Sequence, residues 1–253
     1  MPYALGIDLA GDRLTAAMTR FTSNSWTKPE IFRPAEYPFA GCVDRVGDEV
    51  PVIVSGRPYP AHWLVAELVI WLLQQVTAGR AEQLVISHPG GWGTYRRFLL
   101  SEALREVELP DAVLVAQPVA AATQSQGTVG VYTPRSTAVV RGGELLACHD
   151  SCDLAEPTER SLARTVKSVG LRLDQLQRVL VVGGEEFSGF PCPVDRFVEP
   201  AAGAAVLASR AVRPVEVTAT PRRREGGPVA PRPPVTVTSL SLPKKRVLQL
   251  GRK

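Results

Sequence analysis

The chain has 253 residues, of which 45% are hydrophobic and 21% charged, a balance typical of a folded globular protein rather than a disordered one. No apolar run reaches the ~18–20 residues that cross a bilayer, and the start of the chain lacks the basic segment of a signal peptide, so we expect a cytoplasmic protein. The net charge of +4 is uneven: residues 211–253 hold ten basic and two acidic residues, or +8, which leaves −4 for residues 1–210.

Four cysteines are too few and too scattered for a disulfide framework, which fits a reducing compartment. Two of them lie in Cys148-His-Asp-Ser-Cys152, a sequence that invites a metal interpretation. It lacks the paired spacing of a zinc site, and no second cluster completes four ligands. We therefore expect no metal site there, but a strand end followed by a polar turn.

The first half of the chain alternates expected strands and helices. A hairpin is expected because apolar runs flank the glycine-containing turn Asp8–Asp12, and a helix because Leu64, Leu68 and Leu72 recur at helical spacing. In chain order we expect the hairpin over 3–7 and 14–18, a third strand over 50–55, a helix over 61–76, a strand over 84–87, a helix over 94–107 with Phe98, Leu99, Ala103 and Leu104 inward, a strand over 112–115 and an alanine-rich helix over 118–124.

The second half repeats this pattern. Gly142-Gly143 is typical of a tight hairpin turn. We expect strands over 128–132, 136–141 and 144–148, a helix over 158–169, a strand over 178–182 and a small-residue helix over 200–208. Two successive α/β units are predicted, residues 1–126 and 127–210.

Residues 211–253 differ in composition from the rest. They contain seven prolines, a triple arginine at Arg222–Arg224 and the sequence Pro231-Arg-Pro-Pro234, which together are typical of a linker. We expect a disordered basic tail. Alternatively, the alternating residues 235–242 could add a strand to a partner's sheet edge.

Three pairs of segments carry a family resemblance, and they are best described by their order along the chain. They are Tyr3-Ala-Leu-Gly-Ile-Asp-Leu-Ala-Gly11; Leu84-Val-Ile-Ser-His-Pro89 with Val113-Leu-Val-Ala-Gln-Pro-Val-Ala-Ala-Ala122; and Val179-Leu-Val-Val-Gly-Gly184 with Glu199-Pro-Ala-Ala-Gly-Ala-Ala-Val206. In order and approximate spacing they resemble the ATPase domain of DnaK-type heat-shock chaperones and, more broadly, the actin-like (ribonuclease H-like) fold. About 150 of the residues are covered.

The first phosphate-binding turn of that family resembles G-I-D-L-G-T-T. Here Asp8 matches the acid on the metal side, whereas Gly11 and Asp12 replace the two threonines. An anionic Asp12 would repel phosphate. Asp8 could instead serve only to satisfy the hairpin turn, and both interpretations stay open.

The second phosphate-binding turn, D-L-G-G-G-T in the family, corresponds to Thr133-Pro-Arg-Ser-Thr137. Thr133 replaces an acid, and Pro134 removes an N–H donor where glycines normally approach phosphate. The family's catalytic glutamate corresponds to Gln117, and actins also place a glutamine in this region. The resemblance therefore implies that this turn no longer serves its usual function.

The adenosine-binding segment is the best preserved, with Gly183 and Gly184 at the paired glycines. They are followed by Glu185 and Glu186, which oppose phosphates, and by Phe187, which could stack on a base. A plain strand-to-helix turn explains the glycines equally well. The alanine-rich segments before and after imply two helices that cross closely.

Lengths between these segments also differ from the family. The connections are too short for the upper subdomains that close over the nucleotide, and residues 19–83 hold a single lysine, Lys28. The expected fold is thus α/β, an actin-like two-lobe fold that lacks the upper subdomains, followed by the tail. Without those walls, water would not be excluded from the cleft.

The leading functional hypothesis is a catalytically degenerate pseudo-ATPase that acts as a protein-binding or scaffold module, with no catalytic residue, metal or cofactor. Such proteins resemble actinobacterial chaperone-like proteins associated with type VII secretion or the cell envelope. The alternative is a Mg-ATP or Mg-ADP binder with slow or no hydrolysis, held by Asp8, Gly11, Gln117, Gly183 and Gly184. Expected partners are a protein, through the lobes or the tail, and an anionic membrane surface. No specific nucleic acid is expected, because the tail lacks aromatic residues for stacking.

Overall fold

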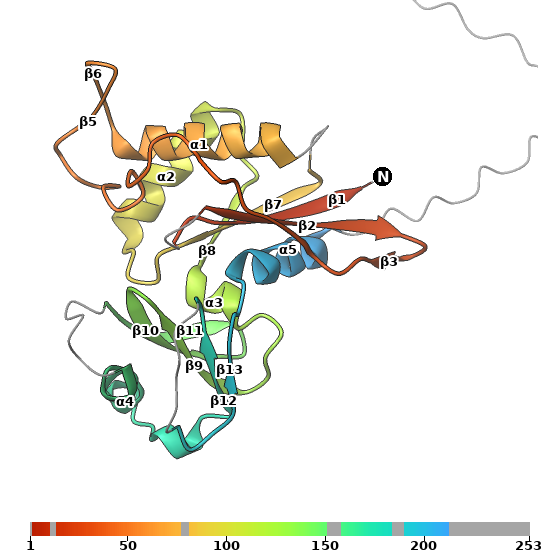
Figure 1. Cartoon of the computed structure of the whole chain (residues 1–253), viewed down its shortest axis with the longest axis vertical. Helices are drawn as coiled ribbons and strands as arrows, with labels where there is room; N and C mark the ends of the chain where they lie inside the picture. The colour runs from red at the N-terminus through yellow and green to blue at the C-terminus, as the bar shows by residue number, and fades with distance from the viewer. Residues whose placement is uncertain (1, 11–13, 77–80, 151–157, 184–189, 213–253) are drawn as a thin grey trace, which may run out of the picture. The chain divides into compact units, whose positions relative to one another are not determined.

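The structure is a computed structural model that describes residues 2–10, 14–76, 81–150, 158–183 and 190–212 (Figure 1). Contacts divide the chain into two compact units, Met1–Arg213 and Pro214–Lys253. All described elements belong to the first unit, which is a mixed α/β structure built on two larger sheets and one hairpin. The α/β class predicted from the sequence is confirmed.

The first sheet has the strand order β3-β2-β1-β7-β8, with β4 also paired to β2. Its strands β1 and β2 form an antiparallel hairpin, and β7 and β8 then add in parallel on the other side of β1. The bounds are β1 (Tyr3–Asp8), β2 (Thr15–Thr22), β3 (Ser25–Trp26), β4 (Glu30–Phe32), β7 (Gln83–His88) and β8 (Val113–Ala116).

The second sheet repeats this arrangement in the order β11-β10-β9-β12-β13. Strands β9, β10 and β11 are antiparallel neighbours, and β12 and β13 add in parallel beyond β9. The bounds are β9 (Thr128–Thr133), β10 (Ser136–Arg141), β11 (Glu144–Asp150), β12 (Arg178–Val181) and β13 (Val194–Asp195). The two sheets therefore share one pattern, an antiparallel hairpin extended by two parallel strands.

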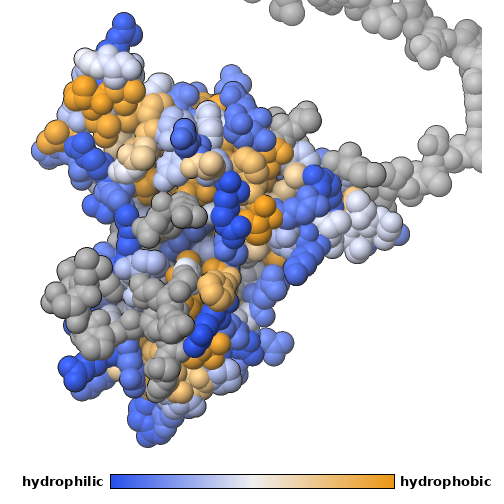
Figure 2. Space-filling model, in the orientation of Figure 1, coloured by the Kyte–Doolittle hydropathy of each residue, from blue (hydrophilic) through white to orange (hydrophobic). Residues whose placement is uncertain are grey.

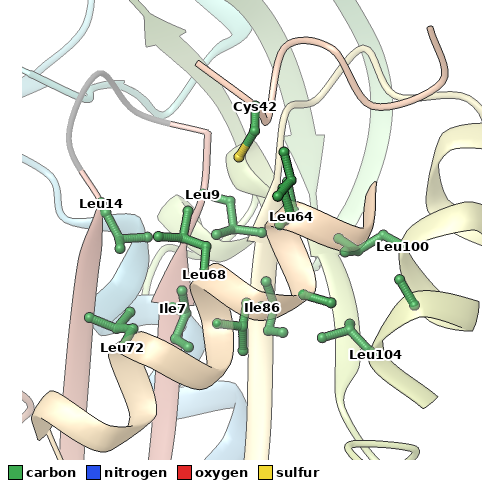
Figure 3. Packing of buried hydrophobic residues seen from close by; sticks show 14 of the residues in the cluster. Ile7, Leu9, Leu14, Cys42, Leu64, Leu68, Leu72, Ile86, Leu100 and Leu104 are labelled. Carbon is green, nitrogen blue, oxygen red and sulfur yellow. The ribbon is translucent and has the colours of Figure 1, made fainter. Parts of the chain in front are cut away.

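Helices cover both faces of the first sheet because β1 is apolar on both. Leu5 and Ile7 point toward α1 (Ala61–Val76) and α2 (Thr94–Glu106), where leucines of both helices complete a buried cluster (Figure 3). Ala4 and Gly6, which alternate with them, face α5 (Pro200–Ala211). The side chains of β1 thus decide which helix can approach on each side: large ones meet α1, and small ones let α5 lie close.

Two helices each pack against a different sheet from the one that they follow in the chain. α3 (Gln117–Ala121) follows the last strand of the first sheet, yet Ala121 packs in a cluster with residues of the second sheet. α5 follows the second sheet and lies beyond the expected boundary near residue 127, yet it packs on β1, β2 and β7. The other face of the second sheet packs against α4 (Thr158–Ser168) through Leu162 and Val166.

α3 and α5 cross at close range. A methyl group on Gly203 of α5 would lie 1.8 Å from the carbonyl oxygen of Ala120 in α3. One on Gly6 would lie 2.2 Å from the backbone nitrogen of Ala205. The expectation of a close helix pair made of small residues is confirmed, and glycine is required because backbone touches backbone.

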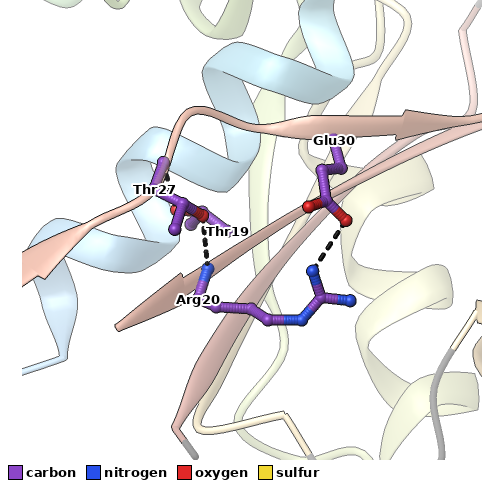
Figure 4. A network of polar contacts seen from close by, with 4 residues as sticks. All are labelled: Thr19, Arg20, Thr27 and Glu30. Atoms are coloured by element: carbon purple, nitrogen blue, oxygen red, sulfur yellow. Dashed lines mark hydrogen bonds and ion pairs between the residues drawn. The ribbon is translucent and has the colours of Figure 1, made fainter. Parts of the chain in front are cut away.

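Polar contacts fix the outer edge of the first sheet (Figure 4). The hydroxyl group of Thr19 donates to the carbonyl oxygen of Thr27 at 2.6 Å, and the backbone N–H of Arg20 donates to the Thr27 hydroxyl at 3.0 Å. The Arg20 guanidinium group also pairs with Glu30 at 2.7 Å. These contacts hold β3 and β4 beside β2, although residues 22–48 have little regular pattern.

One sequence-based expectation is confirmed with shorter bounds, and another is wrong. The strand expected over 50–55 is present as β5 (Val52–Val54), which pairs with β6 (Arg57–Tyr59) in a separate two-stranded sheet, while β4 pairs with β2. Phe98, expected to point inward, is 56% exposed, because the buried stripe of α2 consists of Leu100, Ala103 and Leu104. None of the helices within the described ranges is both long and apolar enough to cross a bilayer.

Candidate functional site

The carboxyl ends of the parallel strands in the first sheet bring three polar side chains together. Asp8 ends β1 and lies in register with Ser87 of β7, while Gln117 directly follows β8. All three side chains are buried, with exposed fractions of 3%, 0% and 2% in that order. In open α/β sheets this edge is where ligands bind, so these residues define the candidate site.

The Asp8 carboxylate is bonded from three sides by the protein itself. Its Oδ1 atom accepts a hydrogen bond from the Ser87 hydroxyl at 2.5 Å and another from the Ala10 backbone N–H at 3.2 Å. Its Oδ2 atom accepts a hydrogen bond from Nε2 of Gln117 at 2.9 Å. Asp8, expected at the acid on the metal side, and Gln117, at the position of the catalytic glutamate, are thus brought into contact across 109 positions of sequence.

Burial has the largest effect on the pKa of Asp8. Desolvation raises its pKa above the ordinary value of 3.8, and the negative charge of Glu199 at the start of α5 acts in the same direction. The hydrogen bonds from Ser87, Gln117 and Ala10 favour the ionised form and oppose part of this rise. The net direction of the pKa shift is upward, because desolvation outweighs these hydrogen bonds.

A stacked aromatic pair lies next to this cluster. The His88 ring lies parallel to Trp92, with centroids 5.5 Å apart, and its Nδ1–H donates to the carbonyl oxygen of Pro89 at 2.8 Å. Burial lowers the pKa of His88, so the ring is neutral at neutral pH. Sequence reasoning assigned no role to Ser87 or His88, because both belong to an apolar strand. Only the position of Ser87 at the end of that strand brings its hydroxyl group to Asp8.

The turn over residues 133–137, which corresponds to the family's second phosphate-binding turn, is closed by hydrogen bonds within itself. The Thr133 hydroxyl oxygen accepts hydrogen bonds from the backbone N–H of Ser136 at 2.9 Å and of Arg135 at 3.3 Å. These two N–H groups are therefore not directed toward a ligand. Pro134 offers no N–H, so the turn lacks the converging donors that bind phosphate.

Arg135, at the tip of this turn, forms an ion pair with Asp44 of the segment between β4 and β5. The two residues line a cavity of about 110 Å³, whose other walls include Leu9, Leu14 and Tyr37. Pockets that hold small-molecule ligands measure about 300–1,000 Å³. The space between the two turns is therefore small for a nucleotide.

Gly183 has a left-handed φ of +99° and lies against Pro134, whose Cγ atom would be 3.6 Å from a methyl group at Gly183. The adenosine-segment glycine and the second turn are thus neighbours. Gly11, Asp12, Gly184 and the three residues after it lie outside the described residues. Of the five residues expected to bind a nucleotide, the structure brings Asp8 and Gln117 into direct contact.

The described part of the Cys148 region, up to Asp150, shows no ligand arrangement. A methyl group on Gly90 would lie 2.7 Å from the Sγ atom of Cys148, whereas His149 bonds to Thr165 through Nδ1 at 3.2 Å. The two side chains therefore leave β11 in opposite directions, and Cys152 lies outside the described ranges. Within those ranges no three His, Cys, Asp or Glu residues are grouped to hold a metal ion.

A larger cavity, of about 600 Å³, is lined by residues of α3 and α5 and does not include Asp8 among its walls. Its walls include Lys28, the ion pair of Arg178 with Asp195, and Phe197, which is 69% exposed with a φ of +58°. It is a second hollow of ligand size.

Comparison with known proteins adds no assignment. No protein-family model matches the chain, and no curated protein matches it in sequence. The candidate function therefore rests on the sequence patterns and on the geometry of the Asp8 site.

Proposed function

We propose that this chain is a reduced actin-like protein, related to the ATPase domains of DnaK-type heat-shock chaperones, that has lost catalysis and acts as a protein-binding or scaffold module. The repeated sheet order supports this proposal, as does the exchange of α3 and α5 between the sheets. The small residues at the helix crossing support it as well. A role in secretion or at the cell envelope rests on the sequence resemblance alone.

The hydrogen bonding of Asp8 is the observation that carries the loss of catalysis. A carboxylate that positions a metal ion and its waters needs oxygen atoms directed into an open, solvated cleft. The oxygens of Asp8 instead accept hydrogen bonds from Ser87, Ala10 and Gln117. Gln117, at the position of the family's catalytic glutamate, donates a hydrogen bond to the same carboxylate.

The second turn supports the same conclusion. In a phosphate-binding turn, backbone N–H groups converge on the anion. Here Thr133 takes up two of these groups, and the guanidinium group of Arg135 pairs with Asp44. Phosphate binding would require both contacts to break.

Nucleotide binding without turnover is the second candidate. The convergence of Asp8 with Gln117 and of Gly183 with Pro134 favours it, because these are the segments that hold nucleotide in the family. Mg²⁺ with ATP or ADP would then be required. In that case Asp8 would exchange its bonds to Ser87 and Gln117 for bonds to hydrated Mg²⁺.

The deciding experiment measures thermal unfolding and phosphate release with Mg-ATP, with Mg-ADP and without nucleotide. A ligand that binds the native state must raise its melting temperature. We expect no rise and no phosphate release above a blank, for the wild type and for a matched Asp8→Asn variant alike. A rise that Asp8→Asn abolishes would establish the second candidate, and turnover that is lost in Asp8→Ala would overturn the pseudo-ATPase proposal.

A further inference from the structure

The cavity of about 600 Å³ has the size and the walls of a site for a small molecule. Its walls come from the residues before and within β4, from the residues that end and follow α3, from the β12–β13 edge and from the start of α5. Ile31, Leu180 and Val198 supply part of its apolar lining. None of the Asp8 cluster lines it, so a ligand in this cavity would not occupy the Asp8 site.

The backbone beside the cavity holds Phe197 away from the second sheet. Before it, Asp195 pairs with β12, and after it the backbone N–H of Val198 donates to the carbonyl oxygen of Val181 at 3.0 Å. Arg196 and Phe197 are therefore left out of the strand pairing. Irregularities of this kind direct side chains toward functional sites.

Phe197 is unfavourable in the unliganded protein in two respects. Its φ of +58° lies in the left-handed region, which a bulky side chain rarely adopts. It is also 69% exposed, although its ring is one of the walls of the cavity. Backbone strain that the surrounding structure imposes is common at ligand-binding positions, and a flat ligand would cover this ring.

The charges of the cavity walls leave one cation without a partner. Asp195 accepts a hydrogen bond from Arg178 at 2.6 Å, and Glu199 accepts one from Arg33 at 2.5 Å. Lys28 forms no ion pair with any described residue. The cavity therefore favours a ligand with a single negative charge, whereas the two carboxylates in its walls disfavour a polyanion such as a nucleotide.

Neighbouring contacts fix the backbone on both sides of Lys28. Thr27 before it is bonded to β2 (Figure 4), and Pro29 after it leads into β4, which is paired with β2. Gln124 and Ser125 add an amide and a hydroxyl group to the walls, and neither side chain is bonded to a described residue. Amide N–H and hydroxyl groups can donate to a carboxylate.

We propose that this cavity binds a small aromatic carboxylate, with its ring against Phe197 and its carboxylate group paired with Lys28. Aromatic rings attract each other in stacked or edge-to-face arrangements, which would remove the exposed Phe197 ring from water. The inference does not depend on whether the Asp8 site binds nucleotide, because the two sites share no residue.

The test is a ligand-observed NMR titration of the full chain, without nucleotide, with naphthoate and with naphthamide, its uncharged counterpart. For a ligand of this size we expect saturable binding of naphthoate with a Kd of about 1 mM or tighter. Naphthamide should bind the wild type about threefold more weakly at low salt, because it lacks the ion pair. Lys28→Ala should remove this preference and leave the affinity for naphthamide unchanged.

Substitution of Phe197 tests the aromatic contact. Phe197→Ser should weaken the binding of naphthoate roughly tenfold. Phe98→Ser is the matched control, because Phe98 is an exposed phenylalanine of α2, 56% exposed, that does not line the cavity. It should leave the affinity unchanged, and circular dichroism checks that each variant is folded.

A second control addresses adsorption of the ring to another apolar surface. Ile53 of the β5–β6 hairpin is 63% exposed, and Figure 2 shows hydrophobic residues gathered over this hairpin. Ile53→Ser should also leave the affinity unchanged. The proposal is wrong if naphthoate binding does not saturate, if naphthamide binds the wild type as tightly as naphthoate, or if either control weakens binding as much as Phe197→Ser.

Discussion

At the scale of single residues, Asp8 combines burial with three hydrogen bonds from protein donors. Its raised pKa means that the folded protein keeps the proton to a higher pH than the unfolded chain does. The group's contribution to stability is therefore fully present below 3.8 and is lost as the pH rises through the raised pKa. Asparagine resembles the protonated acid at every pH.

We therefore predict that Asp8→Asn is at least as stable as the wild type at pH 7, and that its advantage shrinks as the pH is lowered. The Gln117 amide can rotate to accept a hydrogen bond from the new amide group. Asp8→Ala should lose about 3 kcal/mol or more, because the donors of Ser87, Ala10 and Gln117 lose their acceptor at about 1–3 kcal/mol each. Urea unfolding at pH 7 and pH 5 measures the stability of both variants and of the wild type. An Asp8→Asn variant as unstable as Asp8→Ala would contradict this account.

The site was only partly predictable from the sequence. Asp8 and Gln117 stand in segments with a recognisable pattern, so their part in a common site could be proposed. Ser87 could not, because its role depends on the register between β1 and β7, which no local pattern encodes. The internal bonding of Thr133 with Ser136 is equally invisible in a sequence in which glycines have simply been replaced.

At the scale of elements, the crossing of α3 and α5 depends on the absence of a single side chain. Alanine is favoured over glycine inside a helix by about 1 kcal/mol, so Gly203→Ala would normally stabilise α5. Here the new methyl group would meet the carbonyl oxygen of Ala120 at 1.8 Å.

We predict that Gly203→Ala instead destabilises the protein by about 1–3 kcal/mol or more, the cost of overpacking a core. Thermal unfolding should show a melting temperature lowered by roughly 2–10 °C. Gly93→Ala is the control, because no atom lies within 4 Å of a methyl group there, and it should cost less than about 1 kcal/mol. Equal effects of the two changes would mean that the helices can move apart freely.

Elements with strong periodicity were predicted well, and short ones were not. The helix over residues 61–76 and the strand over 136–141 agree with α1 and β10 at both ends. β4, β6 and β13 have two or three residues each, and they are strands because neighbours pair with them rather than because their own residues alternate.

At the scale of the whole molecule, residues 211–253 are expected to contribute little to stability, because they lack the apolar periodicity needed to pack. We predict that removing them leaves the melting temperature nearly unchanged. A fall of more than ~5 °C, or about 2 kcal/mol for a domain of this size, would show that they belong to the fold.

Residues 211–253 are also expected to govern the binding of this protein to an anionic membrane or to a partner. Clustered basic residues near an anionic membrane contribute about 1 kcal/mol each and are screened by salt. Replacing Arg222–Arg224 and Lys244–Arg246 by alanine should therefore abolish liposome flotation or partner pull-down at low salt. Equal recovery of the wild type and the alanine variant would place the binding surface in the folded unit.

The position of α5 has a consequence for synthesis on the ribosome. β8 ends at Ala116, but the helix that covers Ala4 and Gly6 ends at Ala211, 95 residues later. At a synthesis rate of about 5–20 residues per second, one face of the first sheet stays uncovered for roughly 5–20 s. An emerging chain of this protein should thus be a client of the cell's nascent-chain chaperones until its last helix is made.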